Sequence, residues 1–298
     1  MDLDEKSIRI IILEKNFTSI EEIMTTLDSH VHFWQYNKFR DSWMDNMKIL
    51  QQDYLPEFLM QTLSRYGIEG VVAVQADQSE IETRFLVELA KTHNIIKGVV
   101  GWVDLLSPDL EKKLEEFATF PIIKGWRHIA QAEPDNFLQR EDFQKGVAKL
   151  EAYNYTYDIL IYHRQLPAAL SFVEKFPTQK LIIDHCAKPD VKRKKIDEWE
   201  KYMREIAKHP NVYCKLSGLL TEASWKDWSA ADFYPYLDVV FEAFGTDRLV
   251  FGSDWPVVLV SGIYVQWKSL IEKYMEHYSA EEKENVFGLN GMRFYGIE

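Results

Sequence analysis

Two histidines separated by one residue are the first feature of this sequence that could support catalysis. His30 and His32 follow Asp28 in the run Asp-Ser-His-Val-His at 28–32. Side chains two residues apart in a strand point to the same side, so the two imidazoles and the carboxylate would share one face. Such a group can hold a divalent metal ion or polarise a carbonyl oxygen. The structural alternative is a pair of hydrogen-bonded histidines.

A second candidate, Asp254, directly follows an apolar run in Phe-Gly-Ser-Asp-Trp-Pro at 251–256. A carboxylate in this position can take a proton from water, which is the task of a general base in hydrolysis. It could equally bind a metal ion or cap a turn. We expect Asp254 to be catalytic.

His185 and Lys215 are two further polar residues that follow or interrupt apolar runs. Asp184 precedes His185, and strand alternation would let only one of the two face a pocket. We expect His185 to face the pocket and Asp184 to pack outward or to bond to the backbone. Lys215 is costly to bury unless it is paired, so it either belongs to the site or neutralises a neighbouring acid.

Substrate contacts are expected from polar and aromatic residues at the ends of other runs. A planar guanidinium suits a carboxylate or several hydroxyls, and an aromatic face suits a sugar-like ring. Surface salt bridges and ordinary core packing are the alternatives. The candidate residues are Arg127, His128, His163, Arg164 and Trp34.

Eight short apolar runs must position these residues, and helical patterns lie between most of them. Alternating strands and helices predict a parallel sheet. We expect closure into a (β/α)8 TIM barrel, because no Gly-x-Gly-x-x-Gly follows the first run and eight units fit this length. The active site would then lie at the carboxyl ends of the strands. The runs are 24–34, 70–75, 95–104, 122–129, 157–163, 180–185, 211–218 and 248–256, and the clearest helical patterns are 80–93, 108–117, 166–176, 197–209 and 233–244.

The chain has 298 residues and a formal net charge of −12. This charge argues against nucleic acid as a partner, and no run approaches the roughly 20 apolar residues of a membrane span. Two cysteines suit a reducing cytoplasm. We expect residues 24–298 to form one catalytic domain, with 1–23 as an N-terminal extension. The oligomeric state is left open.

Several long motifs, taken in order, resemble the amidohydrolase superfamily, and more closely the amidohydrolase 2 branch of lactone hydrolases. The resemblance spans about residues 24–291. It implies an enzyme that opens a sugar-acid lactone of the L-fuconolactone or L-rhamnonolactone type, and hence a small-molecule sugar lactone as partner. The motifs are DSHVHFW (28–34), GWRHIAQAEPD (125–135), HRQLPAAL (163–170), DHCAKPD (184–190), NVYCKLSGLLTEASW (211–225) and FGSDWPV (251–257).

The resemblance also implies roles for the site residues. Asp254 would activate water, while His30, His32 and His185 would polarise the lactone carbonyl or hold a metal. The bridging lysine that the superfamily's binuclear sites carry on the fourth strand is missing here. At most one divalent ion is therefore expected, on His30, His32 and Asp254, with His163 as a further candidate ligand. Zinc suits such ligands best, and the reaction could also proceed without a metal.

Three other functions remain open. A 2-pyrone-4,6-dicarboxylate hydrolase would need several arginines for the two carboxylates of its substrate, and only Arg127 and Arg164 are good candidates. A decarboxylase of the same superfamily would need its metal. A non-catalytic barrel that only binds its ligand would not depend on Asp254 for turnover.

Overall fold

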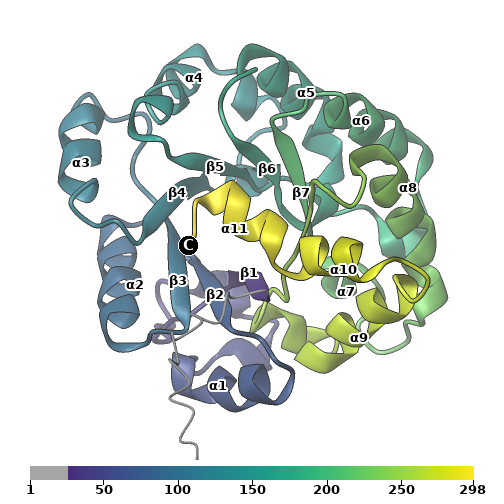
Figure 1. Ribbon diagram of the computed structural model, residues 1–298. Helices are drawn as coiled ribbons and strands as arrows, with labels where there is room; N and C mark the ends of the chain where they lie inside the picture. Colours follow the sequence, from purple (N-terminus) through teal and green to yellow (C-terminus); the bar gives the residue numbers. More distant parts are fainter. Residues whose placement is uncertain (1–25) are drawn as a thin grey trace, which may run out of the picture.

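The computed structural model describes residues 26–298, and its eight strands form one parallel sheet in the order β1 to β8 (Figure 1). Backbone contacts also bring the two edges of the sheet together, because the His32 N–H donates to Trp255 O at 2.7 Å and the Asp254 N–H donates to His30 O at 2.9 Å. The predicted (β/α)8 barrel is confirmed. The strands are β1 (Leu27–Val31), β2 (Gly70–Val74), β3 (Ile96–Gly101), β4 (Ile123–His128), β5 (Thr156–Ile159), β6 (Leu181–Ile183), β7 (Val212–Leu216) and β8 (Leu249–Phe251).

Both faces of β2 are covered, which explains its continuous apolar sequence. All five residues of β2, Gly-Val-Val-Ala-Val, are buried. A strand with helices on one face and barrel interior on the other has no solvent side, so it shows no polar alternation.

The five predicted helices are present, with ends that differ from the prediction by up to two residues. Ser79 begins one of them by accepting a hydrogen bond from the Glu82 N–H at 3.2 Å. Among residues 26–298, no helix combines the length and apolar character needed to cross a bilayer. The helices are α1 (Pro56–Arg65), α2 (Glu80–Thr92), α3 (Leu110–Phe117), α4 (Glu141–Val147), α5 (Leu166–Lys175), α6 (Asp197–Ala207), α7 (Leu219–Glu222), α8 (Tyr234–Phe244), α9 (Tyr264–Tyr274), α10 (Ala280–Phe287) and α11 (Leu289–Tyr295).

The last helix, α11, lies across one end of the barrel (Figure 1). Its Met292, Phe294 and Tyr295 pack with strand residues such as Val72 and Val250 in a buried cluster. Polar chemistry is therefore left to the opposite end, where the strands end. The predicted extension, residues 1–23, lies outside the described residues, and the proposed domain division stays a prediction.

Candidate active site

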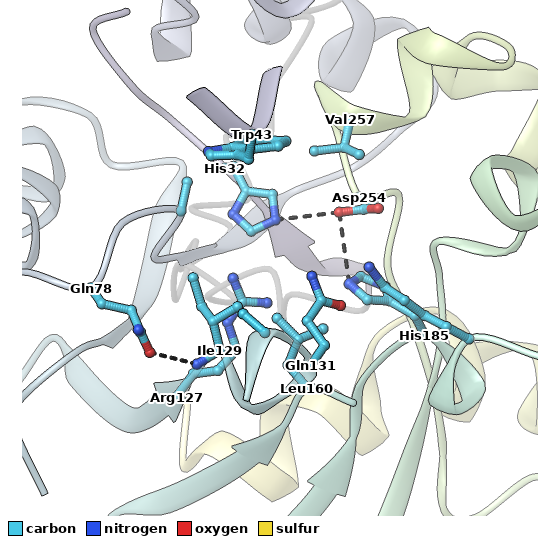
Figure 2. A pocket seen from close by; sticks show the side chains of 13 residues that line it. His32, Trp43, Gln78, Arg127, Ile129, Gln131, Leu160, His185, Asp254 and Val257 are labelled. Carbon is cyan, nitrogen blue, oxygen red and sulfur yellow. Dashed lines mark hydrogen bonds and ion pairs between the residues drawn. The ribbon is translucent and has the colours of Figure 1, made fainter. Parts of the chain in front are cut away.

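Four side chains converge at the carboxyl ends of the strands: His30, His32, His185 and Asp254. The Nε2 atoms of His30 and His32 lie 3.2 Å apart. Asp254 Oδ1 lies 3.3 Å from His32 Nε2 and 3.9 Å from His185 Nε2 (Figure 2). The same oxygen lies 3.8 Å from His30 Nε2. The structure thus brings together the four residues that the sequence predicts to be catalytic.

A sharp turn after β6 places His185 in this group. The chain leaves the strand at Ile183, and His185, Cys186 and Ala187 all adopt left-handed conformations, with φ of 54°, 50° and 58°. Non-glycine residues rarely adopt this conformation, and such strain is common at functional sites. His185 Nδ1 lies 2.8 Å from the Ser217 hydroxyl, which holds the ring in place.

The turn also overturns the expectation for Asp184. Strand alternation does not continue to His185, so Asp184 is not turned outward and both side chains lie inside. Asp184 is fully buried and accepts a hydrogen bond from Arg127 Nη1 at 3.0 Å. The expected strand run 180–185 was too long, since the strand ends at Ile183.

Glycine allows the close packing around His185. Gly218 follows β7 with φ of 66°, and a Cβ atom at this position would lie 2.5 Å from His185 Nδ1. Such a contact is too short for any larger residue, so the turn at Gly218 is part of what positions the imidazole.

Asp28 has a structural role. Its Oδ1 accepts hydrogen bonds from the His30 N–H at 3.1 Å and from the Ser253 N–H at 2.9 Å. It thereby ties β1 to the segment that carries Asp254. Burial raises the pKa of Asp28 to about 6.

A buried ionic network lies beneath the histidines. Lys215 Nζ donates to Asp158 Oδ2 at 2.6 Å, contacts Asp184 Oδ1 at 2.9 Å and lies 3.0 Å from His30 Nδ1. Arg127 Nη1 lies 3.2 Å from His30 Nε2. Both alternatives for Lys215 therefore hold, because it neutralises acids and also contacts the site.

Burial controls the ionisation of the catalytic group. Burial lowers the pKa of His30, His32 and His185, in the last case to about 3, so all three imidazoles are neutral at neutral pH. Burial alone would raise the pKa of Asp254, but the surrounding imidazoles, His185 first, hold it below its ordinary value. An ionised carboxylate thus faces neutral rings.

A cavity of about 310 Å³ opens above this group (Figure 2). His32, Arg127, His185 and Asp254 line its polar side. The sequence reasoning missed the other lining residues, since most come from loops after the strands rather than from the predicted runs. They are Trp43, Ala76, Gln78, Ile129, Gln131, Ala132, Leu160, Lys188 and Val257.

Of the five residues predicted to bind substrate, Arg127 lines this cavity and the other four do not. Arg164 pairs with Asp135 at 2.8 Å on the surface, as in the salt-bridge alternative. The other three have structural partners within the protein. His128 Nε2 lies 3.1 Å from Glu133 Oε1, His163 Nδ1 lies 2.9 Å from Lys188 O, and the Trp34 indole donates to Gln52 O at 2.9 Å.

A single metal ion would find suitable donors here. His30, His185 and Asp254 offer ligand atoms that all lie within 4.8 Å of one another, and no other such group of three occurs within residues 26–298. Two imidazole nitrogens and a carboxylate oxygen match the ligands of catalytic zinc. This set contains His185 in place of the predicted His32. Strand β4 places Arg127, not a bridging lysine, beside His30.

Known proteins share this architecture and sequence. A family model described as amidohydrolase matches residues 27–297. An L-fucono-1,5-lactonase from Burkholderia multivorans is 38% identical, with 91% of this chain and 96% of that protein covered. One from Burkholderia ambifaria is 33% identical over the same shares. A crystal structure of an amidohydrolase from Burkholderia multivorans with bound zinc is 38% identical, has a TM-score of 0.87 and covers 92% of this chain and 99% of its own. The chain belongs to the amidohydrolase family.

Proposed function

We propose that this protein hydrolyses a sugar-acid lactone of the L-fucono-1,5-lactone type to the open-chain aldonic acid. The observation that carries the proposal is the ionised Asp254 beside three buried neutral imidazoles at one side of a cavity. The resemblance to two L-fucono-1,5-lactonases along nearly the whole chain supports this substrate class.

Asp254 is the group that activates water. Its carboxylate accepts one proton as the water oxygen bonds to the lactone carbonyl carbon. The ring C–O bond of the resulting tetrahedral intermediate then breaks, and the proton held by Asp254 passes to the departing ring oxygen. The product is a hydroxy acid, and the base returns to its ionised form.

Arg127 and the histidines stabilise the charge that develops on the carbonyl oxygen. Arg127 is nearly fully buried, lines the cavity and is oriented by its hydrogen bond to Asp184. A fixed cation in a site that excludes water acts strongly on a developing oxyanion, because no solvent has to reorganise. A metal ion held by His30, His185 and Asp254 would, when bound, supply the same polarisation.

The rest of the cavity suits a small ring with hydroxyls on one side and an apolar group on the other. Its volume of about 310 Å³ is at the small end of the range for ligand pockets, roughly 300–1,000 Å³. Gln78, Gln131 and Lys188 can bind hydroxyls, whereas Ile129 and Leu160 form an apolar side. That side would take the methyl group of a 6-deoxy lactone.

A panel of aldonolactones tests the proposal, with acid release followed by a pH indicator. We expect the highest kcat/KM with L-fucono-1,5-lactone. The L-galactono analogue, which carries a hydroxyl on the terminal carbon, should be about tenfold to a hundredfold poorer. Asp254→Asn is the control for contaminating esterases. Failure to open any lactone of the panel would contradict the proposal.

A pyrone dicarboxylate is a weaker candidate substrate. Its two carboxylates would need matched cations, but Arg127 is the one arginine of residues 26–298 that lines the cavity.

We assign the lactonase reaction to carbohydrate catabolism in the cytoplasm. The two cysteines, Cys186 and Cys214, are buried free thiols, which suits a reducing compartment.

A further inference from the structure

We propose that the Lys188 ammonium is a carboxylate-binding site in the cavity, and that it binds the carboxylate of the aldonic acid that hydrolysis produces. The identity of this ligand rests on the proposed function. The lactone is neutral, whereas the product carries one negative charge. Lys188 therefore determines how much more tightly the site binds the product than the substrate.

The turn after β6 places Lys188 at the cavity. Lys188 ends this turn in a left-handed conformation, with φ of 47°, and its half-buried side chain lines the cavity together with His185 and Asp254. Two hydrogen bonds fix its backbone. The Lys188 N–H donates to His185 O at 2.8 Å, and His163 Nδ1 lies 2.9 Å from Lys188 O. The ammonium thus extends from a backbone segment that is held at both of its polar groups.

Within residues 26–298, Lys188 has no acidic partner. No carboxylate oxygen lies within 4.0 Å of its Nζ, and the ammonium donates no hydrogen bond to these residues. Burial raises the pKa of nearby Glu222 and the charge of Lys188 opposes this rise, but the two side chains form no ion pair. Lys215, by contrast, contacts two acids. The charge and the three hydrogens of Lys188 are therefore available to a ligand.

An aromatic ring supports the ammonium without neutralising it. Lys188 Nζ lies 5.4 Å from the centroid of the Tyr162 ring, and the guanidinium carbon of Arg164 lies 4.7 Å from the same centroid. A ring face attracts a cation through its quadrupole and brings no opposite charge. Arg164 is paired with Asp135 on the surface, so only Lys188 of these two cations lacks an acid.

Arg127, the other cation of the cavity wall, already has an acidic partner. Its Nη1 donates to Asp184 Oδ2 at 3.0 Å, and its Nη2 donates to Gln75 O. Lys188 is thus the one cation among the lining residues that has no carboxylate beside it. One such cation suits a product with a single carboxylate.

The chemistry of hydrolysis explains why this cation would matter. The reaction creates a carboxylate in the cavity that also contains the ionised Asp254, and two like charges repel each other. A charge-assisted hydrogen bond from Lys188 offsets this repulsion. The neutral ester cannot form a bond of the same strength, so removal of the ammonium should weaken the binding of the product far more than that of the lactone.

Calorimetric titration at pH 7 tests the site with two probes, L-fuconate and its neutral amide, L-fuconamide. In Lys188→Met we expect the affinity for L-fuconate to fall about tenfold to a hundredfold and that for L-fuconamide to change by less than about threefold. The proteins are compared at equal metal content, because a bound ion would also attract a carboxylate. A wild type that does not bind L-fuconate, or a folded Lys188→Met protein that binds it equally well, would overturn the inference.

Two further variants separate the site from the overall charge of the protein. Lys188→Arg keeps the positive charge and should retain most of the affinity for L-fuconate. Lys192→Met removes an equal charge from an exposed residue that does not line the cavity, and it should change this affinity by less than about twofold. An equal loss in Lys192→Met and Lys188→Met would show that net charge, and not a site at Lys188, attracts the carboxylate.

Inhibition kinetics distinguishes this inference from the proposed function. Lys188→Met should raise the inhibition constant of L-fuconate about tenfold to a hundredfold and change the KM of the lactone by less than about threefold. A wild type that binds L-fuconate through Lys188 but opens no lactone would contradict the proposed function and leave the carboxylate site in place. Lactone hydrolysis with an inhibition constant that is the same in Lys188→Met would contradict the carboxylate site alone.

Discussion

The interior of this barrel contains two layers of ionisable residues, which differ in whether their charges are paired with an opposite charge. The buried layer consists of Asp158, Asp184 and Lys215, whose charges lie within 3 Å of a partner of opposite charge. The cavity layer consists of His32, His185 and Asp254. Its carboxylate faces neutral rings, and no lysine or arginine of residues 26–298 contacts it within hydrogen-bond distance. Burial costs free energy in both layers, but only the buried layer offsets that cost by pairing.

The comparison indicates which layer should control the rate of catalysis and which should control the stability of the fold. Pairing satisfies a charge and removes its reactivity, so the buried layer is suited to hold side chains in place. A carboxylate without a cationic partner keeps lone pairs that water can reach, so it can accept a proton. Substitutions in the two layers should therefore have different signatures.

The largest effect is expected for Asp254→Asn in the cavity layer. An amide cannot accept the proton of water, so kcat should fall about a thousandfold. The free energy of unfolding should fall less than in the buried-layer variant below, although the lowered pKa of Asp254 means that the fold stabilises its charged form. Initial rates with L-fucono-1,5-lactone and urea denaturation measure the two quantities. Turnover close to that of the wild type would show that another residue is the base.

Asp184→Asn in the buried layer should have the larger effect on stability. The substitution removes one negative charge that pairs with Arg127 and Lys215. Breaking a buried ion pair typically costs about 3–5 kcal/mol. The urea midpoint should fall accordingly. A variant as stable as the wild type would mean that the buried layer does not stabilise the barrel.

The sequence predicts the cavity layer better than the buried layer, for a physical reason. His32 and Asp254 are polar residues at the ends of apolar runs, and a parallel barrel gathers such ends on one face. Asp158 lies inside an expected strand, and its pairing with Lys215 spans 57 positions. The one available signal was Lys215 itself, since a lysine within an apolar run requires a buried acid.

Local backbone conformation limits the prediction of the site in a second way. Asp184 was assigned to the wrong side because strand periodicity does not reveal that His185 adopts a φ of 54°. Trp43 lies in a short 3-10 helix, Ser42–Met44, far from any expected run, and only the folded chain brings it to the cavity.

The pH dependence of stability should distinguish the layers further. The folded-state pKa of His185 is lowered to about 3, so below the unfolded value near 6.5 the unfolded state binds more protons. Stability should therefore fall as the pH decreases from 7 to 5, by up to about 1.4 kcal/mol per pH unit for this residue. Asp28, with its pKa raised to about 6, acts in the opposite direction. The contribution of His185 is therefore best taken as the difference between wild type and His185→Asn.

The smallest effect is expected outside both layers, at Arg164. Its guanidinium pairs with Asp135 on the surface, where solvent screens the interaction, and it does not line the cavity. Arg164→Ala should change kcat/KM by less than about twofold and stability by less than about 1 kcal/mol. A matched Arg127→Ala variant, which removes the same side chain from the cavity wall, should lose activity strongly. If Arg164→Ala instead lost activity to a similar degree, the substrate would extend from the cavity to the rim, and the site would be larger than the two layers.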